Sequence, residues 1–447
     1  MAADPAARAA ADVRMEDVVS LCARRGFVFP SSEIYGGING FWDYGPLGVE
    51  LKNNLKALWW QRVVRERDDV EGLDSSIICH PRTWEASGHV EHFGDQMVDC
   101  RACKRRFRAD QLDGIEPCAA REDGSHDLTP PRAFNLMLRT SVGASEDAAS
   151  VAYLRAETCQ AIFNDFKRVR EGARQKIPFG IAQVGKAFRN EINPRNFTFR
   201  SREFEQAELE FFVHPREREK WFEYWLAERV AFHRALGFGE DRLRVRPHDK
   251  DELAHYAAAA ADIEYRFPFG WQEIEGVHDR GDWDLSRHSE FSGKDLSVLD
   301  EDAGERFMPM VIETSVGVDR TALAILCNGY RVETLADGEA RTVLALHPSV
   351  APIKAAVLPL SKKLAEPARR LLAQLRREWN VFYDESGNIG RRYRRQDEVG
   401  TPLCVTYDFE SEQDGQVTVR DRDTMQQDRI ALDAVPAYLR ERLDGPR

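Results

Sequence analysis

Arginines, glutamates and phenylalanines are concentrated in one segment, residues 184–212, VGKAFRNEINPRNFTFRSREFEQAELEFF. They are Arg189, Arg195, Arg200 and Arg202, then Glu203, Glu205, Glu208 and Glu210, with Phe188, Phe197, Phe199 and Phe204 between them. Guanidinium groups bind phosphates, and aromatic rings beside them can hold a purine by stacking and cation–π contact. A ladder of surface ion pairs is the commoner arrangement and is the alternative. The segment therefore raises the hypothesis of a nucleotide site.

Two strands joined by a turn would bring these side chains together. The stretch EFEQAELEFF alternates in the manner of a strand, and INPRNFTF, which contains Asn-Pro, is typical of a turn. We therefore predict an antiparallel hairpin over residues 180–213. One arm would offer arginines and the other carboxylates, both directed into one pocket.

A second segment with nucleotide-binding chemistry is ETSVGVDRTALAIL, a predicted strand running into a helix. Gly317 would let the backbone approach a nucleotide, and Arg320 at the start of the helix would meet a phosphate. The alternative is a buried helix entered through a glycine turn.

The bulk composition limits the class of protein. The chain has 447 residues, 43% of them hydrophobic, and a net charge of −12, which indicates two or three globular domains. The acidic balance argues against binding nucleic acid by overall charge but permits a local basic patch. No run approaches the roughly 20 apolar residues of a membrane span. Eight cysteines in so long a chain favour a reducing cytoplasm.

Patterning along the chain predicts its organisation. Residues 1–14 lack an apolar core of signal-peptide length, so we expect a flexible tail. Helices are predicted after Pro46, over 150–171, over 217–237 and over 361–379. A composition shift at 333–342 predicts a linker before a small α/β domain, and residues 99–130 form a loop-rich insertion.

The C-terminal part carries a basic cluster with an aromatic residue inside it, GRRYRRQ. Its members are Arg391, Arg392, Tyr393, Arg394 and Arg395. Such a cluster suits phosphate contact and base stacking, as on single-stranded RNA. A solvated run of charge is the alternative.

Cys100 and Cys103 have the spacing of zinc ligands, but a closed zinc site needs four. Arg121 stands where a second Cys-x-x-Cys starting at Cys118 would need its second cysteine, and His126 is a further possible ligand. Zn²⁺ and a metal-free insertion both stay open at this point.

In order, the Pro46 helix, the hairpin and the Gly317–Arg320 segment resemble the three signature motifs of class II aminoacyl-tRNA synthetases. ASGHVEHFGDQMVDC (86–100), PRAFNLM (131–137), YLRAETCQ (153–160), DELAHYAAAAADIEYRFPFGWQEIEG (251–276) and NIGRRYRRQDEVGTP (388–402) look like the dimeric glycyl-tRNA synthetase family. The resemblance runs from about residue 15 to the C-terminus. It implies an α+β fold, with an antiparallel β-sheet catalytic domain flanked by helices at 15–335. It also implies a C-terminal α/β anticodon-binding domain at 340–447.

The resemblance further implies a cytoplasmic homodimer that uses glycine, ATP, Mg²⁺ and tRNA(Gly), with no membrane association. The implied catalytic residues are Arg189, Glu191 and Arg320. Implied ATP contacts are these three with Asn190, Phe199, Arg200, Ser201, Arg202, Glu203, Phe204, Glu273, Ile274, Gly317, Val318 and Asp319. Glu273 is also the implied Mg²⁺ ligand, and the 391–395 cluster the implied tRNA contact.

For glycine, the family resemblance implies acidic residues that grip the ammonium group and leave no room for a side chain. The implied contacts are Arg108, Glu157, Phe204, Gln206, Glu208, Glu313, Ser315 and Gly317. An apolar pocket could not select glycine, because one methylene is worth only ~1–3 kcal/mol. Three buried carboxylates are costly without a cation, and we expect the bound ammonium to make the cluster tolerable.

Two alternatives remain. A class II synthetase for serine, threonine, proline or histidine would need room for a side chain, which the three glutamates argue against. A non-catalytic relative that only binds nucleic acid or a polymerase would have lost active-site residues. The presence of Arg189, Phe204 and Arg320 favours an enzyme.

Overall fold

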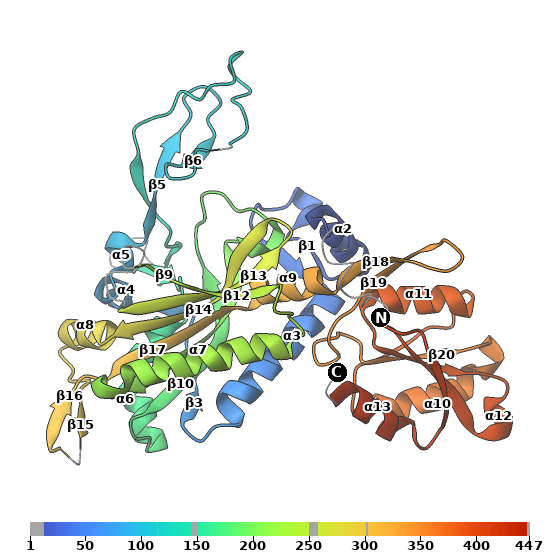
Figure 1. Cartoon of the computed structure of the whole chain (residues 1–447). Helices are drawn as coiled ribbons and strands as arrows, with labels where there is room; N and C mark the ends of the chain where they lie inside the picture. Colours follow the sequence, from blue (N-terminus) through green and yellow to red (C-terminus); the bar gives the residue numbers. More distant parts are fainter. Residues whose placement is uncertain (1–12, 114, 145–149, 250–257, 301–302, 445–447) are drawn as a thin grey trace.

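The computed structural model describes residues 13–113, 115–144, 150–249, 258–300 and 303–444. A seven-stranded sheet lies at its centre, in the order β12-β13-β14-β17-β11-β10-β3 (Figure 1). The strands are β3 (Val70–Gly72), β10 (Phe179–Phe188), β11 (Glu203–Val213), β12 (Leu243–Pro247), β13 (Ala259–Phe267), β14 (Gly270–Gly281) and β17 (Met310–Gly317). Every neighbouring pair is antiparallel except β10 with β3.

The predicted hairpin is confirmed as β10 and β11, which pair from Phe179↔Phe212 to Phe188↔Glu203. Alternate residues of these strands enter different hydrophobic clusters, because successive side chains of a strand point to opposite faces. Phe211 packs in the cluster on one face, and Phe212 in the cluster on the other. The hairpin is therefore buried on both sides.

Helices cover both faces of the sheet. One face carries α3 (Pro46–Trp60), α7 (Arg218–Ala235) and α9 (Val318–Gly329), whose apolar residues share a cluster with Leu209 and Ile312. The opposite face carries α6 (Cys159–Ala173) and α8 (Trp283–Ser292). Pro46 is the first residue of α3, where its missing N–H costs nothing.

Short elements complete the N-terminal part. They are α2 (Met15–Arg25), β1 (Val28–Pro30), η1 (Glu33–Tyr35), β2 (Trp42–Tyr44), η2 (Gln61–Arg65), β4 (Ile78–Cys79), α4 (Pro81–Ala86), α5 (His89–His92), β8 (Arg139–Ser141), β9 (Val151–Leu154), η4 (Phe197–Phe199), η5 (Pro215–Glu217), β15 (Val298–Asp300) and β16 (Glu305–Phe307). The helix predicted over 150–171 begins only at Cys159, and the residues before it form strand β9. The expected tail lies outside the described residues except for its last two positions.

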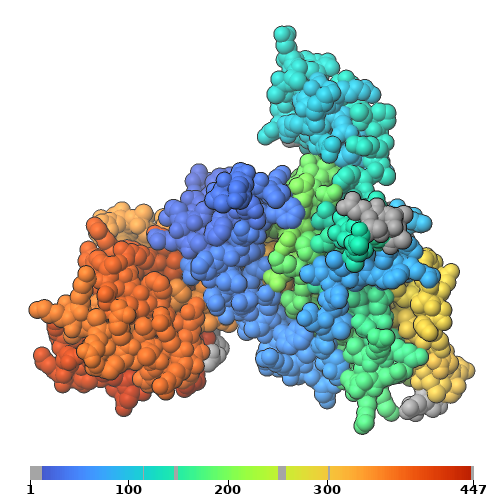
Figure 2. Space-filling view, turned by 180° about the vertical axis from the view of Figure 1, so that it is seen from behind, coloured from blue at the N-terminus to red at the C-terminus, as the bar shows by residue number. Residues whose placement is uncertain are grey.

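The insertion forms a lobe that projects from the main body (Figures 1 and 2). Its sheet has the order β6-β5-β7, with β5 (Gly94–Asp99), β6 (Arg106–Arg108) and β7 (Arg132–Asn135). Both pairs are antiparallel. The rest of the insertion is irregular, as its loop-rich sequence predicts.

The C-terminal part has its own five-stranded sheet, in the order β21-β20-β22-β23-β24. The strands are β20 (Ala355–Pro359), β21 (Val381–Tyr383), β22 (Leu403–Tyr407), β23 (Gln416–Asp421) and β24 (Gln427–Ala431), and η6 (Lys362–Leu364), α10 (Ala365–Leu375), α11 (Ile389–Val399), α12 (Ser411–Asp414) and α13 (Val435–Asp444) accompany them. The first three strands in this order are parallel, which fits the predicted α/β unit. The α+β fold class is thus confirmed.

The segment predicted as a linker is instead a β-hairpin, β18 (Tyr330–Thr334) with β19 (Ala340–Leu344). Arg341 on β19 is fully buried and donates to Asp397 of α11 at 2.8 Å and to Glu333 at 2.7 Å. The linker pattern came from the exposed polar residues of the hairpin turn, whereas Arg341 anchors the hairpin by buried ion pairs. No helix of the described chain is both long and apolar enough to cross a membrane.

A close approach of α3 to the N-terminal strand predicts the effect of one substitution. A Cβ added at Gly48 would lie 1.9 Å from the backbone oxygen of Phe27. A backbone atom cannot move aside as the end of a flexible side chain can. Gly48→Ala should destabilise the protein by about 1–3 kcal/mol, measured by guanidinium unfolding. The control is Gly172→Ala in α6, where nothing lies within 4 Å, and it should stabilise the protein by about 0.5–1 kcal/mol. Equal effects of the two variants would contradict this packing.

Candidate active site

A cavity of about 390 Å³ opens over strands β11, β14 and β17 of the central sheet. At one end lies Arg189, which directly follows β10. Its guanidinium lies 5.3 Å from the ring centroids of both Phe93 and Phe204, and its Nε donates to the Ala156 carbonyl at 3.1 Å. Cation–π contacts on two rings hold this cation in one place without neutralising it.

A second cation, Arg320, enters the cavity from the first turn of α9. Its guanidinium lies 4.5 Å from the centroid of the Phe199 ring, and its Nη1 donates to Glu273 Oε2 at 2.9 Å. Although burial opposes ionisation, Arg320 lowers the pKa of Glu273 below its usual value. Glu273 is therefore an anionic oxygen donor on the cavity wall, the type of ligand that Mg²⁺ prefers.

Glu191 and Arg200 form the rim. Arg200 donates to Glu191 Oε2 from Nε and Nη2, both at 2.7 Å. Asp95 of β5 lies 3.9 Å from Arg200 and 2.8 Å from Arg108 of β6. A chain of charges therefore joins the insertion to the cavity rim.

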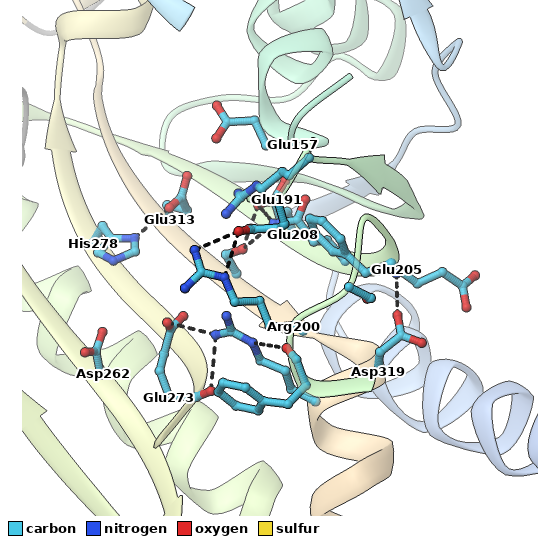
Figure 3. A pocket seen from close by; sticks show the side chains of 18 of the residues that line it. Glu157, Glu191, Arg200, Glu205, Glu208, Asp262, Glu273, His278, Glu313 and Asp319 are labelled. Carbon is cyan, nitrogen blue, oxygen red and sulfur yellow. Dashed lines mark hydrogen bonds and ion pairs between the residues drawn. The ribbon is translucent and has the colours of Figure 1, made fainter. Parts of the chain in front are cut away.

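At the other end of the cavity, three carboxylates converge: Glu157 before α6, Glu208 on β11 and Glu313 on β17 (Figure 3). Glu208 accepts hydrogen bonds from Thr158 N at 2.8 Å, Ser315 Oγ at 2.6 Å, and Gln206 Nε2 at 3.1 Å. The predicted acidic cluster is thus a single assembly within the cavity.

The three carboxylates differ in their electrostatics. Against the effect of burial, His89 and Arg280 lower the pKa of Glu157 well below its usual value, and Arg280 and His278 lower that of Glu313. Burial, together with Glu313 and Glu157, raises the pKa of Glu208 to about 7. Glu208 is therefore the carboxylate whose charge is least compensated by the protein.

Two basic residues of the cluster, Arg280 and His278, were missed by the sequence argument. Arg280 donates to Glu313 Oε2 at 2.6 Å and to both carboxylate oxygens of Asp284 at 2.8 and 3.0 Å. His278 Nδ1 lies 2.6 Å from Glu313 Oε1. The expectation that a bound ammonium alone compensates the glutamates is thus corrected. The sequence did offer a signal for these two residues. His278 and Arg280 are two positions apart in VHDRG, and residues i and i+2 of a strand lie on the same face.

The helix α3 is tied to the cavity through Lys52. The buried Nζ of Lys52 lies 2.7 Å from Asp319 Oδ1 on α9 and 2.7 Å from Glu205 Oε2 on β11. Burial opposes the charge, but Asp319 and Glu205 raise the pKa of Lys52 above its usual value. One cation therefore joins all three segments that the sequence singled out.

Most predicted site residues line the cavity, namely Glu157, Arg189, Glu191, Phe199, Arg200, Ser201, Phe204, Gln206, Glu208, Glu273, Glu313, Ser315, Gly317, Asp319 and Arg320. The predicted residues outside its lining are Arg108, Asn190, Arg202, Glu203, Ile274 and Val318. Ile274 and Val318 are buried in the core. Arg202 donates to the backbone oxygens of Glu191 and Asn39, and Glu203 pairs with Lys186. Direct side-chain contact with ATP is therefore not expected from Arg202, Glu203, Ile274 or Val318.

The basic cluster of the C-terminal part lies on α11 and is only partly accessible. Arg392 is buried and donates to the Pro359 carbonyl at 2.6 Å, and the Tyr393 hydroxyl bonds Thr406 Oγ1 at 2.7 Å. Arg395 pairs with Asp384 at 2.7 Å. Arg391 is exposed and Arg394 half-buried. The prediction that all five residues contact RNA is corrected for Arg392, because this side chain is buried and hydrogen-bonded within the domain.

An antiparallel sheet that carries a hairpin arginine and a helix-start arginine around one cavity defines the chain as a class II aminoacyl-tRNA synthetase. The family described as "tRNA synthetase class II core domain (G, H, P, S and T)" matches residues 144–329, and "Anticodon binding domain" matches residues 354–442. Among curated relatives, Glycine--tRNA ligase of Geobacillus kaustophilus is 54% identical, over 96% of this chain and 99% of its own.

Two more relatives carry the same name. Glycine--tRNA ligase of Treponema denticola is 54% identical over 94% of each chain, and that of Borreliella burgdorferi is 53% identical over 96% of this chain and 97% of its own. The chain therefore belongs to the glycine–tRNA ligase family.

A fourth acidic residue, Glu210, lies beneath the cluster and provides a pH test. Within the described residues neither of its carboxylate oxygens has a hydrogen-bond partner, and burial and Glu313 raise its pKa well above the usual value. A carboxyl group with a raised folded pKa loses its stabilising contribution as pH rises from the unfolded pKa to the folded one. Glu210→Gln should therefore gain stability relative to wild type between pH 5 and pH 8, measured by chemical unfolding. The exposed Glu219→Gln should show no such change, and an identical pH trend in both variants would refute the raised pKa of Glu210.

Proposed function

We propose that this chain activates glycine with ATP and transfers it to tRNA(Gly). The observation that carries this proposal is the division of one cavity into two ends. Arginines and phenylalanines line one end, and three carboxylates with Ser315 line the other. A nucleoside triphosphate fits the end with arginines and phenylalanines by charge and stacking. An ammonium group fits the end with the carboxylates.

Glycine is the amino acid that the carboxylate end favours. Glu157, Glu208 and Glu313 are each held in place by neighbours, so the space beside the ammonium cannot widen without breaking buried hydrogen bonds. Leaving a buried charge unpaired costs several kcal/mol, which exceeds the ~1–3 kcal/mol that an extra methyl could gain. Exclusion of larger side chains thus follows from occupied volume.

For ATP, Phe204 would stack on the adenine, Arg189 would bind the α-phosphate, and Arg320 would bind the γ-phosphate. Glu273 would hold Mg²⁺, which when bound neutralises charge on the phosphate oxygens. The glycine carboxylate attacks the α-phosphorus, the bond to the bridging oxygen breaks, and pyrophosphate leaves. A ribose hydroxyl of the terminal tRNA nucleotide then attacks the carbonyl carbon of the adenylate, and AMP leaves. Positioning and fixed cations supply the catalysis, and no side-chain nucleophile is needed.

For tRNA, Arg391 and Arg394 on α11 present guanidinium groups at or near the surface of the anticodon-binding domain. Phosphate contacts of this kind position the nucleic acid without reading its sequence. Since tRNA charging serves translation, we expect the protein in the cytoplasm.

A non-catalytic nucleic-acid-binding relative is the competing function, and ATP–pyrophosphate exchange separates the two. We expect exchange with glycine and with none of the other nineteen amino acids. Arg189→Ala should lower exchange by about 10²-fold or more, because it removes a fixed cation from the α-phosphate. Binding of tRNA in a filter assay should be largely kept. The exposed Arg168→Ala on α6 is the matched control and should retain exchange. Absence of exchange in wild type would favour the binding-only alternative, and equal loss of exchange and tRNA binding would remove the role given to Arg189.

We also propose a homodimer formed through the segment before α3. Ile34 and Tyr35 of η1 are 87% and 86% exposed, and Ile38 and Val49 nearby are also exposed. Large apolar side chains gathered in this way are typical of interaction surfaces. The double substitution Ile34→Ser, Tyr35→Ser should weaken dimerisation by tenfold or more in sedimentation equilibrium. The exposed Phe409→Ser in the C-terminal part should leave it unchanged. A wild-type protein with the mass of one chain would exclude the dimer.

A further inference from the structure

The projecting insertion lobe (described residues 94–113 and 115–135) has very little hydrophobic core. Its buried apolar residues are Met97, Val98, Cys100, Phe107 and Cys118, so two of the five are cysteines. Figures 1 and 2 show the lobe standing away from the main body, which leaves it few other contacts. Units of this size usually need a disulfide or a metal to fold stably.

Four metal-binding atoms meet inside this lobe. The Sγ atoms of Cys100, Cys103 and Cys118 and a ring nitrogen of His126 all lie within 4.8 Å of one another. The Cys100 and Cys118 sulfurs are 3.8 Å apart, and the Cys103 sulfur is 3.8 Å from His126 Nδ1. A tetrahedron with Zn–S bonds of about 2.3 Å has edges of about 3.8 Å, whereas a disulfide requires about 2.05 Å. The spacing is that of ligands around one ion.

The tautomer of His126 supports coordination. Its Nε2 lies 2.9 Å from the backbone oxygen of Glu116, which can only accept a hydrogen bond. Nε2 must therefore carry the proton, and Nδ1, which faces the sulfurs, presents its lone pair. A second hydrogen bond of this kind is the usual support of a metal-bound histidine.

Tight backbone turns follow Cys100 and Cys118. Lys104 N donates to Cys100 O at 2.9 Å and has a left-handed backbone with φ of +62°. Around Cys118, Arg121 N donates to Cys118 O at 3.2 Å, and Cys118 N donates to Gly124 O at 2.8 Å. Arg121 stands where a second Cys-x-x-Cys would need its second cysteine. The group still has four metal-binding atoms, because His126 offers the fourth.

We propose that the lobe binds one Zn²⁺ through Cys100, Cys103, Cys118 and His126 in a closed structural site. Three thiolates and an imidazole suit Zn²⁺ in a tetrahedral arrangement, and no position remains open for a substrate. Cys100 directly follows β5 and Cys103 shortly precedes β6, so the ion would fix the pairing of these two strands. That pairing carries Asp95 and Arg108, which join the lobe to Arg200 at the cavity rim.

Metal content of the purified full-length protein tests the proposal independently of aminoacylation. Elemental analysis of protein produced in zinc-supplemented medium should give about one zinc per chain. Cys103→Ser and His126→Ala should lose it, while Cys79→Ser, which alters a cysteine outside the cluster, should keep it. Replacement of the metal by Co²⁺ should produce the intense visible bands of a tetrahedral thiolate site in wild type and Cys79→Ser.

The opposite results are equally definite. Wild-type protein with far less than one zinc per chain, or with iron or copper in its place, overturns the proposal. Retention of zinc by both ligand variants also overturns it, and so does a Cys100–Cys118 disulfide found by mass spectrometry in freshly purified protein. The wild-type outcomes do not depend on whether a ligand variant folds.

Discussion

The site depends on the cost of burying several carboxylates beside one another. Isolated anions in a protein interior are prohibitively expensive, so each must find a cation, a set of hydrogen-bond donors or a proton. Here Glu313 has Arg280 and His278, Glu157 has His89, and burial together with Glu313 raises the pKa of Glu210, which favours its protonated form. Glu208 has donors but no partner of opposite charge among its described contacts. Of the three carboxylates that line the cavity, Glu208 is therefore the one without a cationic partner in the protein.

Strand register determines this distribution. Glu210 stands opposite Glu313 and Glu313 opposite His278, whereas Glu208 stands opposite Ser315 and Ser315 opposite Gly276. Adjacent rows across β11, β17 and β14 thus carry different chemistry. The first row has an ionisable side chain on every strand, and the second has one only on β11. A shift of one residue would turn these side chains to the opposite face and destroy the site.

Local patterns predicted much of the fold, and the resemblance predicted most of the cavity lining. The hairpin followed from alternation and an Asn-Pro turn. The helix α3 followed from Pro46 and from the helical spacing of Leu47, Leu51, Leu55 and Leu58. Properties that arise only in three dimensions were not predictable. Arg280 compensates a glutamate 33 positions away, and His126 meets Cys103 across a loop. The β18–β19 hairpin read as a linker because its turn is polar and exposed. Asp397, which pairs with the buried Arg341, lies 56 positions further along the chain and could not be foreseen.

The raised pKa of Glu208 has a consequence for how substrate enters. Burial and the neighbouring glutamates raise the pKa of this carboxyl group to about 7, so its protonated form is accessible near neutral pH before anything binds. Under the proposed function, the incoming ammonium takes the place of that proton as the counter-charge. For the protonated form, binding of the amino acid then becomes an exchange of one cation for another, and a proton is released into the medium.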